Sequence, residues 1–311
     1  MTTLLVAASG GHLSQLVELS ARIEHLGEDA LWVTFDSAQS RSLLRGRNTE
    51  FIRPIEERDL VGVCLGLAAA HRIFSSRNVS AVVSTGSGIA LSFLPYAAIR
   101  GIAAHYIESA ARVGSPSLTG RLLQLVPGVQ LYRQYPQAAT GRWRFAGSVF
   151  DGFEATEGKE RPVRRIVVTL GSGVHSFRRL IERLVKILPP DAEVLWQTGS
   201  TSVEGLPIEA RPIVPAATLN DAILAADAVI AHAGCGSSLS ALNLGKYAVL
   251  VPREPRYGEL VDNHQIELAS FLGERDLALH RTPETVTFAD IEMAAARKVS
   301  RRAKLPALSL G

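Results

Sequence analysis

The chain has 311 residues, of which 47% are hydrophobic, and at ~150 residues a domain this is material for about two buried cores. The formal net charge of +3 is too small a surplus for a dedicated nucleic-acid binder, and no apolar run reaches the ~18 residues of a membrane-spanning helix. Two distant cysteines, Cys64 and Cys235, argue against a disulfide framework and a thiolate metal site, and the start lacks a secretory-signal pattern, so we expect a cytoplasmic protein.

Residues 1–150 predict the first domain. Short β-branched apolar runs alternate there with helical patterns, which indicates a parallel sheet covered by helices on both faces. We expect strands at Leu4–Ala8, Ala30–Phe35, Val79–Ser84 and Ala103–Ile107. This half carries 14 Arg and no Lys against 10 acidic residues, so the positive charge of the chain is concentrated in it. Such a charge suits a diphosphate or an anionic membrane surface.

A polar stretch at residues 151–163 predicts an interdomain linker, because it contains Gly152, Gly158 and Pro162 and no apolar period. The second predicted domain, residues 164–311, begins again with a strand, a glycine turn and a helix. We expect its strands at Ile166–Leu170, Glu193–Trp196, Ala228–Ala231 and Ala248–Val251, and a frayed tail from Ser300 to Gly311. The predicted fold class is therefore α/β, with two doubly wound, Rossmann-like domains facing a central cleft at the carboxyl ends of their strands.

Loops rich in Gly, Ser and His follow the predicted strands in both halves. Glycine lets the backbone approach a ligand closely and a helix start presents unpaired N–H groups, so such loops favour an anion. One helix start contributes only ~0.3–1 kcal/mol, which means that several loops have to converge on one ligand.

Two common nucleotide-binding signatures are missing. A nicotinamide dinucleotide is disfavoured although Asp36 ends the second strand, because Ser9-Gly10-Gly11-His12 does not match G-x-G-x-x-G. The chain also lacks G-x-x-x-x-G-K-[ST], which argues against a P-loop nucleotidase. An oxidoreductase is therefore not expected.

The motifs themselves carry a family resemblance. One segment of the first half reads VVSTGSGIALSFLPYAAIRGIAAHYIESAARVGSPSLTGRLL. It resembles the membrane-associated acceptor half of the two-part polyprenyl-diphosphate N-acetylglucosaminyltransferases. Their catalytic donor half, which belongs with the MurG-like glycosyltransferase family 28, is similar to IVVTLGS, WQTGS and VIAHAGCGSSLSALNLGKYAVLVPREPRYGELVDNHQIELA. The chain thus resembles a fusion of acceptor half and donor half, in that order. This resemblance implies a GT-B fold, a UDP-sugar donor, a polyprenyl-diphosphate-linked acceptor, inversion at the anomeric carbon and no obligatory metal.

The resemblance assigns the UDP-sugar to loops of the second half. We expect its diphosphate and nucleoside to be bound by Gly171, Ser172, Gly173, Ser176, Gln197, Thr198, Gly199, His232, Gly234, Gly236, Ser237 and Ser238. The sugar hydroxyls are assigned to Asn263, His264 and Gln265, with His264 equally suited to cap its own helix. Ser240 stands where MurG-like domains often have a ribose-binding Glu, so this pattern leaves the donor less securely identified.

Loops of the first half are assigned to the acceptor. Its diphosphate is expected at Gly10, Gly11, Gly86, Ser87, Gly88 and Arg112. Two residues are candidates for the base that deprotonates the acceptor hydroxyl. His12 sits at a helix start, which favours the neutral imidazole that a base requires, and Glu108 matches the Glu-containing acceptor loop of the family. His12 is also suited to hydrogen-bond the diphosphate or to tie down the glycine loop.

The sequence therefore predicts an inverting glycosyltransferase that moves N-acetylglucosamine or a related hexose onto a lipid-linked saccharide in polysaccharide or glycolipid assembly. It would lie on the inner face of the cell membrane, and Leu60–Phe74 is the candidate contact, although such a stretch is equally typical of a core-packed helix. Two alternatives stay open: a UDP-sugar epimerase or hydrolase of similar fold, and a non-catalytic UDP-sugar-binding subunit. We expect no nucleic-acid partner and no cofactor besides the donor.

Overall fold

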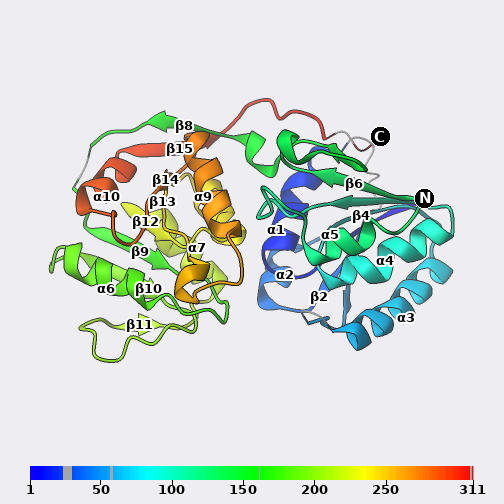
Figure 1. Ribbon diagram of the computed structural model, residues 1–311, viewed down its shortest axis with the longest axis horizontal. Helices are drawn as coiled ribbons and strands as arrows, with labels where there is room; N and C mark the ends of the chain where they lie inside the picture. Colours follow the sequence, from blue (N-terminus) through cyan, green and yellow to red (C-terminus); the bar gives the residue numbers. More distant parts are fainter. Residues whose placement is uncertain (24–29, 57–58, 161, 309, 311) are drawn as a thin grey trace. The chain divides into compact units, whose positions relative to one another are not determined.

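The computed structural model describes residues 1–23, 30–56, 59–160, 162–308 and 310. The chain divides into two units. The first comprises Met1–Asp151 together with the described residues from Leu305 onward, and the second comprises Gly152–Lys304. Each unit is built around a parallel β-sheet with helices packed against it (Figure 1), which confirms the predicted α/β class.

The first unit contains a doubly wound sheet with the strand order β3-β2-β1-β4-β5-β6-β7, all neighbours parallel. Its strands are β1 (Thr2–Ala7), β2 (Leu31–Phe35), β3 (Thr49–Ile52), β4 (Val79–Gly86), β5 (Ala103–Ile107), β6 (Val129–Arg133) and β7 (Trp143–Phe145). Its helices are α1 (Gly11–Ser20), α2 (Ala38–Leu43), α3 (Leu60–Ser76), α4 (Gly88–Ile99) and α5 (Leu118–Leu123), with the 3-10 turns η1 (Pro136–Ala138) and η2 (Val149–Gly152) at its end.

Central strands of this sheet are buried on both faces. Leu4 and Val6 of β1 join Val82 of β4 and Phe93 of α4 in one buried cluster. The intervening Leu5 is also fully buried, outside that cluster and on the face that α1 covers. A strand enclosed on both sides needs apolar residues at every position, so β1 has a continuous apolar run and could be predicted from the sequence.

The second unit repeats this plan with the strand order β11-β10-β9-β12-β13-β14. Its parallel strands are β9 (Arg165–Thr169), β10 (Glu193–Gln197), β11 (Ala210–Arg211), β12 (Ala228–Ala231), β13 (Val249–Leu250) and β14 (Leu279–His280). A separate antiparallel pair consists of β8 (Phe153–Glu157) and β15 (Arg297–Arg301). The helices are α6 (Arg178–Ile187), α7 (Ala216–Ala225), α8 (Cys235–Asn243), α9 (His264–Glu274) and α10 (Phe288–Ala295), with the 3-10 turn η3 (Pro255–Tyr257).

Two predicted boundaries differ from the structure. The expected linker at residues 151–163 contains β8, which belongs to the second unit because β15 returns to pair with it. The tail expected to fray within the second domain instead joins the first unit from Leu305 onward. Arg22 holds it there: its Nε donates to the carbonyl of Pro306 at 2.8 Å, and its own carbonyl accepts from the amide of Leu308 at 2.9 Å. These partners are too far apart in sequence to be recognised from a local pattern.

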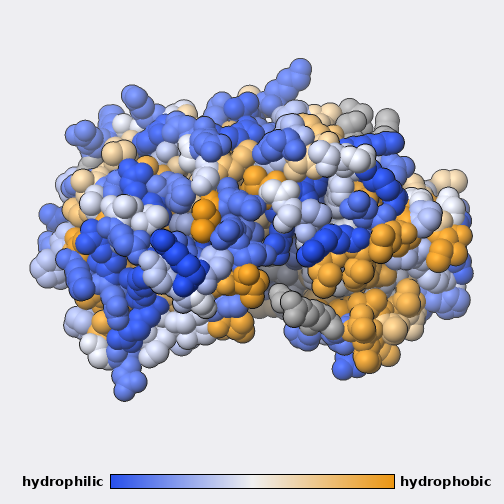
Figure 2. Space-filling model, viewed as in Figure 1, coloured by the Kyte–Doolittle hydropathy of each residue, from blue (hydrophilic) through white to orange (hydrophobic). Residues whose placement is uncertain are grey.

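Helix α3 has two apolar faces, and only one of them packs into the core, chiefly against α4. Its buried face includes Ala70, Ile73 and Phe74. Its other face leaves Leu60 74% and Val61 71% exposed, although both are apolar. Figure 2 shows apolar side chains gathered over the α3 and α4 part of the first unit. Across the residues that the structure describes, no helix is both long and apolar enough to cross a bilayer.

Candidate functional site

Each sheet has one switch point, which is the position between two neighbouring strands at which the direction of winding reverses. In the first unit the chain proceeds outward from β1 through β2 to β3, and then from β4 through β5 to β7 on the other side. The second unit does the same from β9 and from β12. Loops at the carboxyl ends of two such neighbouring strands diverge and leave room for a ligand. The predicted glycine loops lie at these two positions, after β1 and β4 and after β9 and β12.

The first of these points presents open amide groups. Helix α1 begins after Gly10, which has φ 86°, and α4 begins after Ser87; neither start has a side-chain cap or an acidic residue in its first turn. No described residue accepts a hydrogen bond from the backbone N–H groups of Gly10, Gly11, Ser87 or Gly88. Two uncapped helix starts on adjacent strands can together bind an anion.

His12 links the two loops of the first unit. Its Nδ1 lies 2.7 Å from the carbonyl oxygen of Thr85, and the hydroxyl of Thr85 donates back to the carbonyl of His12 at 2.8 Å. A carbonyl only accepts, so Nδ1 carries the proton, and in the neutral ring Nε2 is then the basic nitrogen. A Cβ added to Gly86 would lie 3.2 Å from Cε1 of His12, so this glycine makes room for the ring.

Glu108, the other candidate base, is 1% exposed and surrounded by donors of its own chain. Its Oε1 accepts from the amide of Ser109 at 2.9 Å and from the hydroxyl of Tyr106 at 3.1 Å. Its Oε2 accepts from the amide of Ser117 at 2.9 Å and from that residue's hydroxyl at 3.1 Å. Both carboxylate oxygens are thus occupied by donors of the chain itself and are buried away from an incoming acceptor hydroxyl. The geometry therefore disfavours Glu108 as the base. Its hydrogen bonds instead stabilise the loop that ends in Arg112.

Gln15 and Gln134 also stabilise this loop, and no motif in the sequence indicates them. The Oε1 of Gln15 accepts from the amide of Ala110 at 2.7 Å and from Nε2 of Gln134 at 3.2 Å. Nε2 of Gln15 donates to the hydroxyl of Ser109 at 3.1 Å. Both glutamines are 1% exposed, so they support the loop from inside and do not face a ligand.

The second unit presents an amide-rich loop after β9. No described residue accepts a hydrogen bond from the backbone N–H groups of residues 172–176, and Ser172, Gly173 and Ser176 are exposed. Helix α8 begins beside this loop after Gly234, again without a side-chain cap or an acidic residue in its first turn. Within the described chain, the N–H groups of Gly236 and Ser237 likewise have no acceptor.

His232 fills the space between these two loops. A Cβ added to Gly171 would lie 2.6 Å from Cε1 of His232, and one added to Gly234 would lie 2.2 Å from its Nε2. Any larger residue at either position would clash with the imidazole ring, so both positions have to be glycine. Burial, reinforced by the charge of Arg253, lowers the pKa of His232 to about 3. The ring is neutral under physiological conditions and acts as a spacer.

Four of the predicted donor-binding side chains point into the protein. Gln197 is 5% exposed; its Nε2 donates to the hydroxyl of Thr169 at 2.9 Å, and its Oε1 accepts from the amide of Val214 at 3.0 Å. Thr198 is also buried, and Ser238 lies on the interior side of α8, where it lines a small apolar gap. Gln265 is buried, with its Oε1 accepting from the amide of Arg253 at 3.1 Å. This burial disfavours all four side chains as direct ligands.

The remaining predicted donor residues are at least partly accessible. Gly199 is half-buried, and its backbone packs against Gly171. Asn263 is exposed and immediately precedes α9. His264 is the first residue of that helix; its amide donates to the carboxylate of Asp262 at 3.2 Å, and its Nδ1 contacts the same carboxylate. Asp262 thus orients the His264 ring, a partner that the motif did not reveal.

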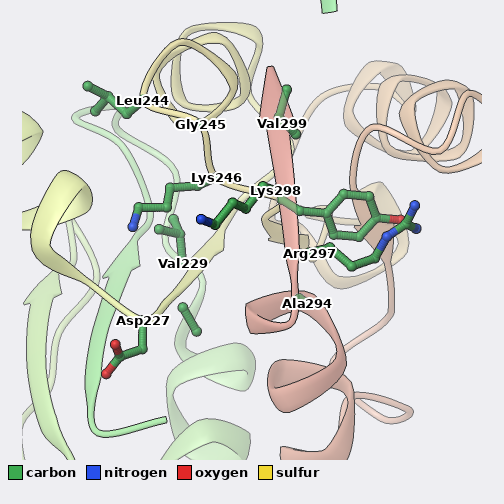
Figure 3. Close-up of a pocket in the computed structure, with 11 residues that line it drawn as sticks. Asp227, Val229, Leu244, Gly245, Lys246, Ala294, Arg297, Lys298 and Val299 are labelled. Atoms are coloured by element: carbon green, nitrogen blue, oxygen red, sulfur yellow. The ribbon is translucent and has the colours of Figure 1, made fainter. Parts of the chain in front are cut away.

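A polar cavity of about 300 Å³ lies at the opposite, amino-terminal edge of the second sheet (Figure 3). Three of its four charged side chains bind the chain itself. Lys246 donates to the carbonyl of Ala226 at 2.6 Å, Arg297 pairs with Asp276, and Asp227 accepts from the amide of Arg165 at 2.9 Å. The cavity therefore has a structural explanation. Across the described part of the chain, no three His, Cys, Asp or Glu residues lie together as a metal site would require.

Comparison with known proteins gives three results. Residues 165–299 match the glycosyltransferase family 28 C-terminal domain. The chain is 34% identical over 134 residues to a UDP-N-acetylglucosamine--N-acetylmuramyl-(pentapeptide) pyrophosphoryl-undecaprenol N-acetylglucosamine transferase of Prosthecochloris aestuarii; this covers 40% of the chain and only 33% of the relative.

Its fold is similar to that of MurG from Acinetobacter baumannii, with a TM-score of 0.59, 20% identity, and coverage of 94% of this chain and 89% of that one. It is also similar to the kitacinnamycin glycosyltransferase, with a TM-score of 0.57, 17% identity, and coverage of 94% and 89%. The chain therefore has a GT-B fold, and its residues 165–299 match the glycosyltransferase family 28 C-terminal domain.

Proposed function

We propose that the chain is a fused acceptor-half and donor-half glycosyltransferase that moves a hexose, in the first instance N-acetylglucosamine, from its UDP ester to a polyprenyl-diphosphate-linked saccharide. The observation that carries this proposal is the family 28 domain at residues 165–299, whose amide-rich loops lie at the β9/β12 switch point. The partial relative from Prosthecochloris aestuarii is named for a transfer of this kind. Products of such a reaction serve the assembly of polysaccharides or glycolipids.

The donor diphosphate would bind the open amides of residues 172–176 and of the α8 start. Backbone N–H groups fixed in advance stabilise the negative charge that develops on the departing UDP. This arrangement favours transfer without an obligatory metal ion. Turnover that is unchanged by a chelator would support this part of the proposal, and turnover that stops with the chelator and returns with a divalent cation would contradict it.

His12 would act as the base in this reaction. Nε2 takes the proton of the acceptor hydroxyl while the hydroxyl oxygen forms a bond to the anomeric carbon. The bond from that carbon to the UDP oxygen breaks at the same time, and the electron pair leaves with UDP. One displacement on the face opposite UDP inverts the anomeric configuration. The acceptor diphosphate would lie at the open amides of Gly10, Gly11, Ser87 and Gly88.

The exposed apolar face of the first unit would contact the membrane that holds the acceptor. Its members are Leu60, Val61, Leu65 and Leu67 of α3, Ile99 at the end of α4, and Leu118, Leu122 and Leu125 in and after α5. Exposed apolar groups of this number are uncommon on a freely soluble surface, and the arginines of this unit suit anionic lipid. Leu60→Ser with Val61→Ser should reduce co-sedimentation with anionic vesicles, whereas Leu224→Ser, a 61%-exposed site of the second unit, should not.

The proposal is tested by supplying both substrates. The purified chain is incubated with each of a panel of UDP-sugars and an undecaprenyl-diphosphate-linked sugar; mass spectrometry detects the product, and NMR determines its anomeric configuration. We expect a β-linked product from an α-linked UDP-sugar, and UDP release that depends on the acceptor. Acceptor-independent consumption of the donor would instead indicate an epimerase or hydrolase. UDP-sugar binding without turnover would indicate a non-catalytic subunit.

A further inference from the structure

Arg253 is a buried cation behind the donor loop. It follows β13, is 3% exposed, and stacks its guanidinium 5.4 Å from the ring centre of buried Phe177. No described carboxylate lies within ion-pair distance of it, and its Nε has no hydrogen-bond partner among the described residues. A buried charge of this kind is costly to maintain, so its retention calls for an explanation.

The hydrogen bonds of Arg253 connect it to both ends of the loop after β9. One terminal nitrogen donates to the carbonyl of Leu170 at 3.0 Å and to the carbonyl of His175 at 2.9 Å. The backbone amide of Arg253 is itself held by Gln265, at the start of α9. A single side chain thus fixes the loop that follows β9 relative to the loop that follows β13.

These bonds also determine where the loop amides point. In a trans peptide the C=O and N–H groups point in opposite directions. Because Arg253 holds the carbonyl of His175 inward, the N–H group of Ser176 in the same peptide points away from the interior. A cationic donor on a carbonyl also polarises that peptide, which makes its N–H a stronger donor. Ser176 is exposed, and no described residue accepts from its N–H group.

We propose that Arg253 is a positioning residue of the donor site: it holds the carbonyls of Leu170 and His175 inward, which fixes both ends of the loop after β9 and aims the Ser176 amide at the diphosphate of a UDP donor. This inference rests on the proposed function. Arg253 does not contact the donor; its charge and hydrogen bonds act through the loop. Burial lowers the pKa of Arg253 to about 10, so the guanidinium still carries its charge at neutral pH.

Binding of UDP and of uridine to variants separates this role from general stabilisation. Arg253→Met removes the hydrogen bonds and the charge, and Arg253→Lys keeps the charge. The matched control is Arg183→Met, because Arg183 likewise binds a backbone carbonyl, that of Val286, with two nitrogens at 3.0 and 2.7 Å. By calorimetry we expect Arg253→Met to weaken UDP binding about tenfold or more and uridine binding less than about twofold. Arg253→Lys should recover most of the loss, and Arg183→Met should change neither affinity.

Failure of the inference and failure of the proposed function give different results. Equal losses for UDP and uridine, or equal effects of Arg253→Met and Arg183→Met, would overturn the inference. A wild-type chain that does not bind UDP would instead refute the proposed function. If Arg253→Met does not fold, amide NMR of the wild-type chain still decides the matter: UDP, and not uridine, should shift the Ser176 amide resonance, and an unshifted resonance would contradict the role assigned to Arg253.

Discussion

The two switch points of this chain use the same parts for different purposes. Each has glycine turns, an uncapped helix start and a histidine beside a carbonyl at the end of a central strand. In the first unit Nδ1 of His12 lies 2.7 Å from the carbonyl of Thr85, which fixes the tautomer of a half-buried ring. In the second unit Nδ1 of His232 is 3.4 Å from the carbonyl of Thr169, and burial lowers its pKa to about 3.

The comparison shows that the packing around the ring, more than residue type, decides what a histidine does. His12 keeps a partly accessible ring with a defined basic nitrogen, so it suits proton transfer. His232 is locked between Gly171 and Gly234 and stays neutral, so it shapes the loops that hold an anion.

His12→Asn should reduce turnover by about 10²–10⁴-fold, the usual contribution of a general base. Asn can still donate to the carbonyl of Thr85, but it cannot take a proton, so the variant removes the chemistry and keeps the contact. The affinity for UDP, measured by calorimetry, should stay at the wild-type value because the groups proposed to hold UDP are the backbone amides of residues 172–176 and of the α8 start. A His12→Asn variant that retains a tenth or more of the turnover would exclude His12 as the base.

Gly171→Ala should destabilise the protein by about 1–3 kcal/mol. Gly171 has φ +72°, and a Cβ there would meet the His232 ring at 2.6 Å, so both the backbone and the spacer ring are disturbed. The control is Gly173→Ala, since no atom lies within 4 Å of a Cβ at that position. Its unfolding free energy, measured in urea, should remain within about 0.5 kcal/mol of the wild type. Equal losses in the two variants would contradict the spacer role of His232.

Glu108→Gln should cost about 1–3 kcal/mol of stability, because the new NH₂ group would face the donors that now bind Oε1 or Oε2. Turnover per folded molecule should fall much less than in His12→Asn. Thermal unfolding and a turnover assay below the melting temperature measure the two effects separately. If Glu108→Gln abolished turnover and left stability unchanged, the two residues would have to exchange roles.

The sequence was sufficient for the features that depend on local pattern. The buried strand β1 has a continuous apolar run, and β4 has a shorter one at residues 81–83. Glycines at or after the ends of these strands mark turns that only small residues allow, as at Gly86 beside His12. The family motif HAGCGSS indicated the second domain. Its first glycine, Gly234, leaves the space that the His232 ring occupies.

The features that the sequence did not reveal depend on distant partners or on helical phase. Arg253 binds Leu170, and Gln134 binds Gln15; nothing in the local sequence indicates either pairing. Ser237 and Ser238 look equivalent in the motif. They differ in exposure because one residue turns a helix by about 100°, and the start of α8 fixes which serine faces inward.

The last prediction is a pH dependence of stability to which His232 contributes. Its pKa is about 3 in the folded chain and 6.5 in the unfolded chain. Between pH 6.5 and pH 3, His232 is therefore protonated in the unfolded chain and neutral in the folded chain. Stability from this residue is complete above pH 6.5 and decreases toward pH 3 by at most about 1.4 kcal/mol per pH unit.

The variant His232→Gln isolates this contribution. Urea unfolding at pH 7 and pH 5 should show a smaller decrease for His232→Gln than for the wild type, each compared with its own value at pH 7. His105 and His280, whose pKa values are also lowered by burial, titrate in both proteins and cancel in the difference. Parallel decreases would mean that His232 accepts a proton in the folded chain, and it would then resemble His12 in chemistry as well as in position.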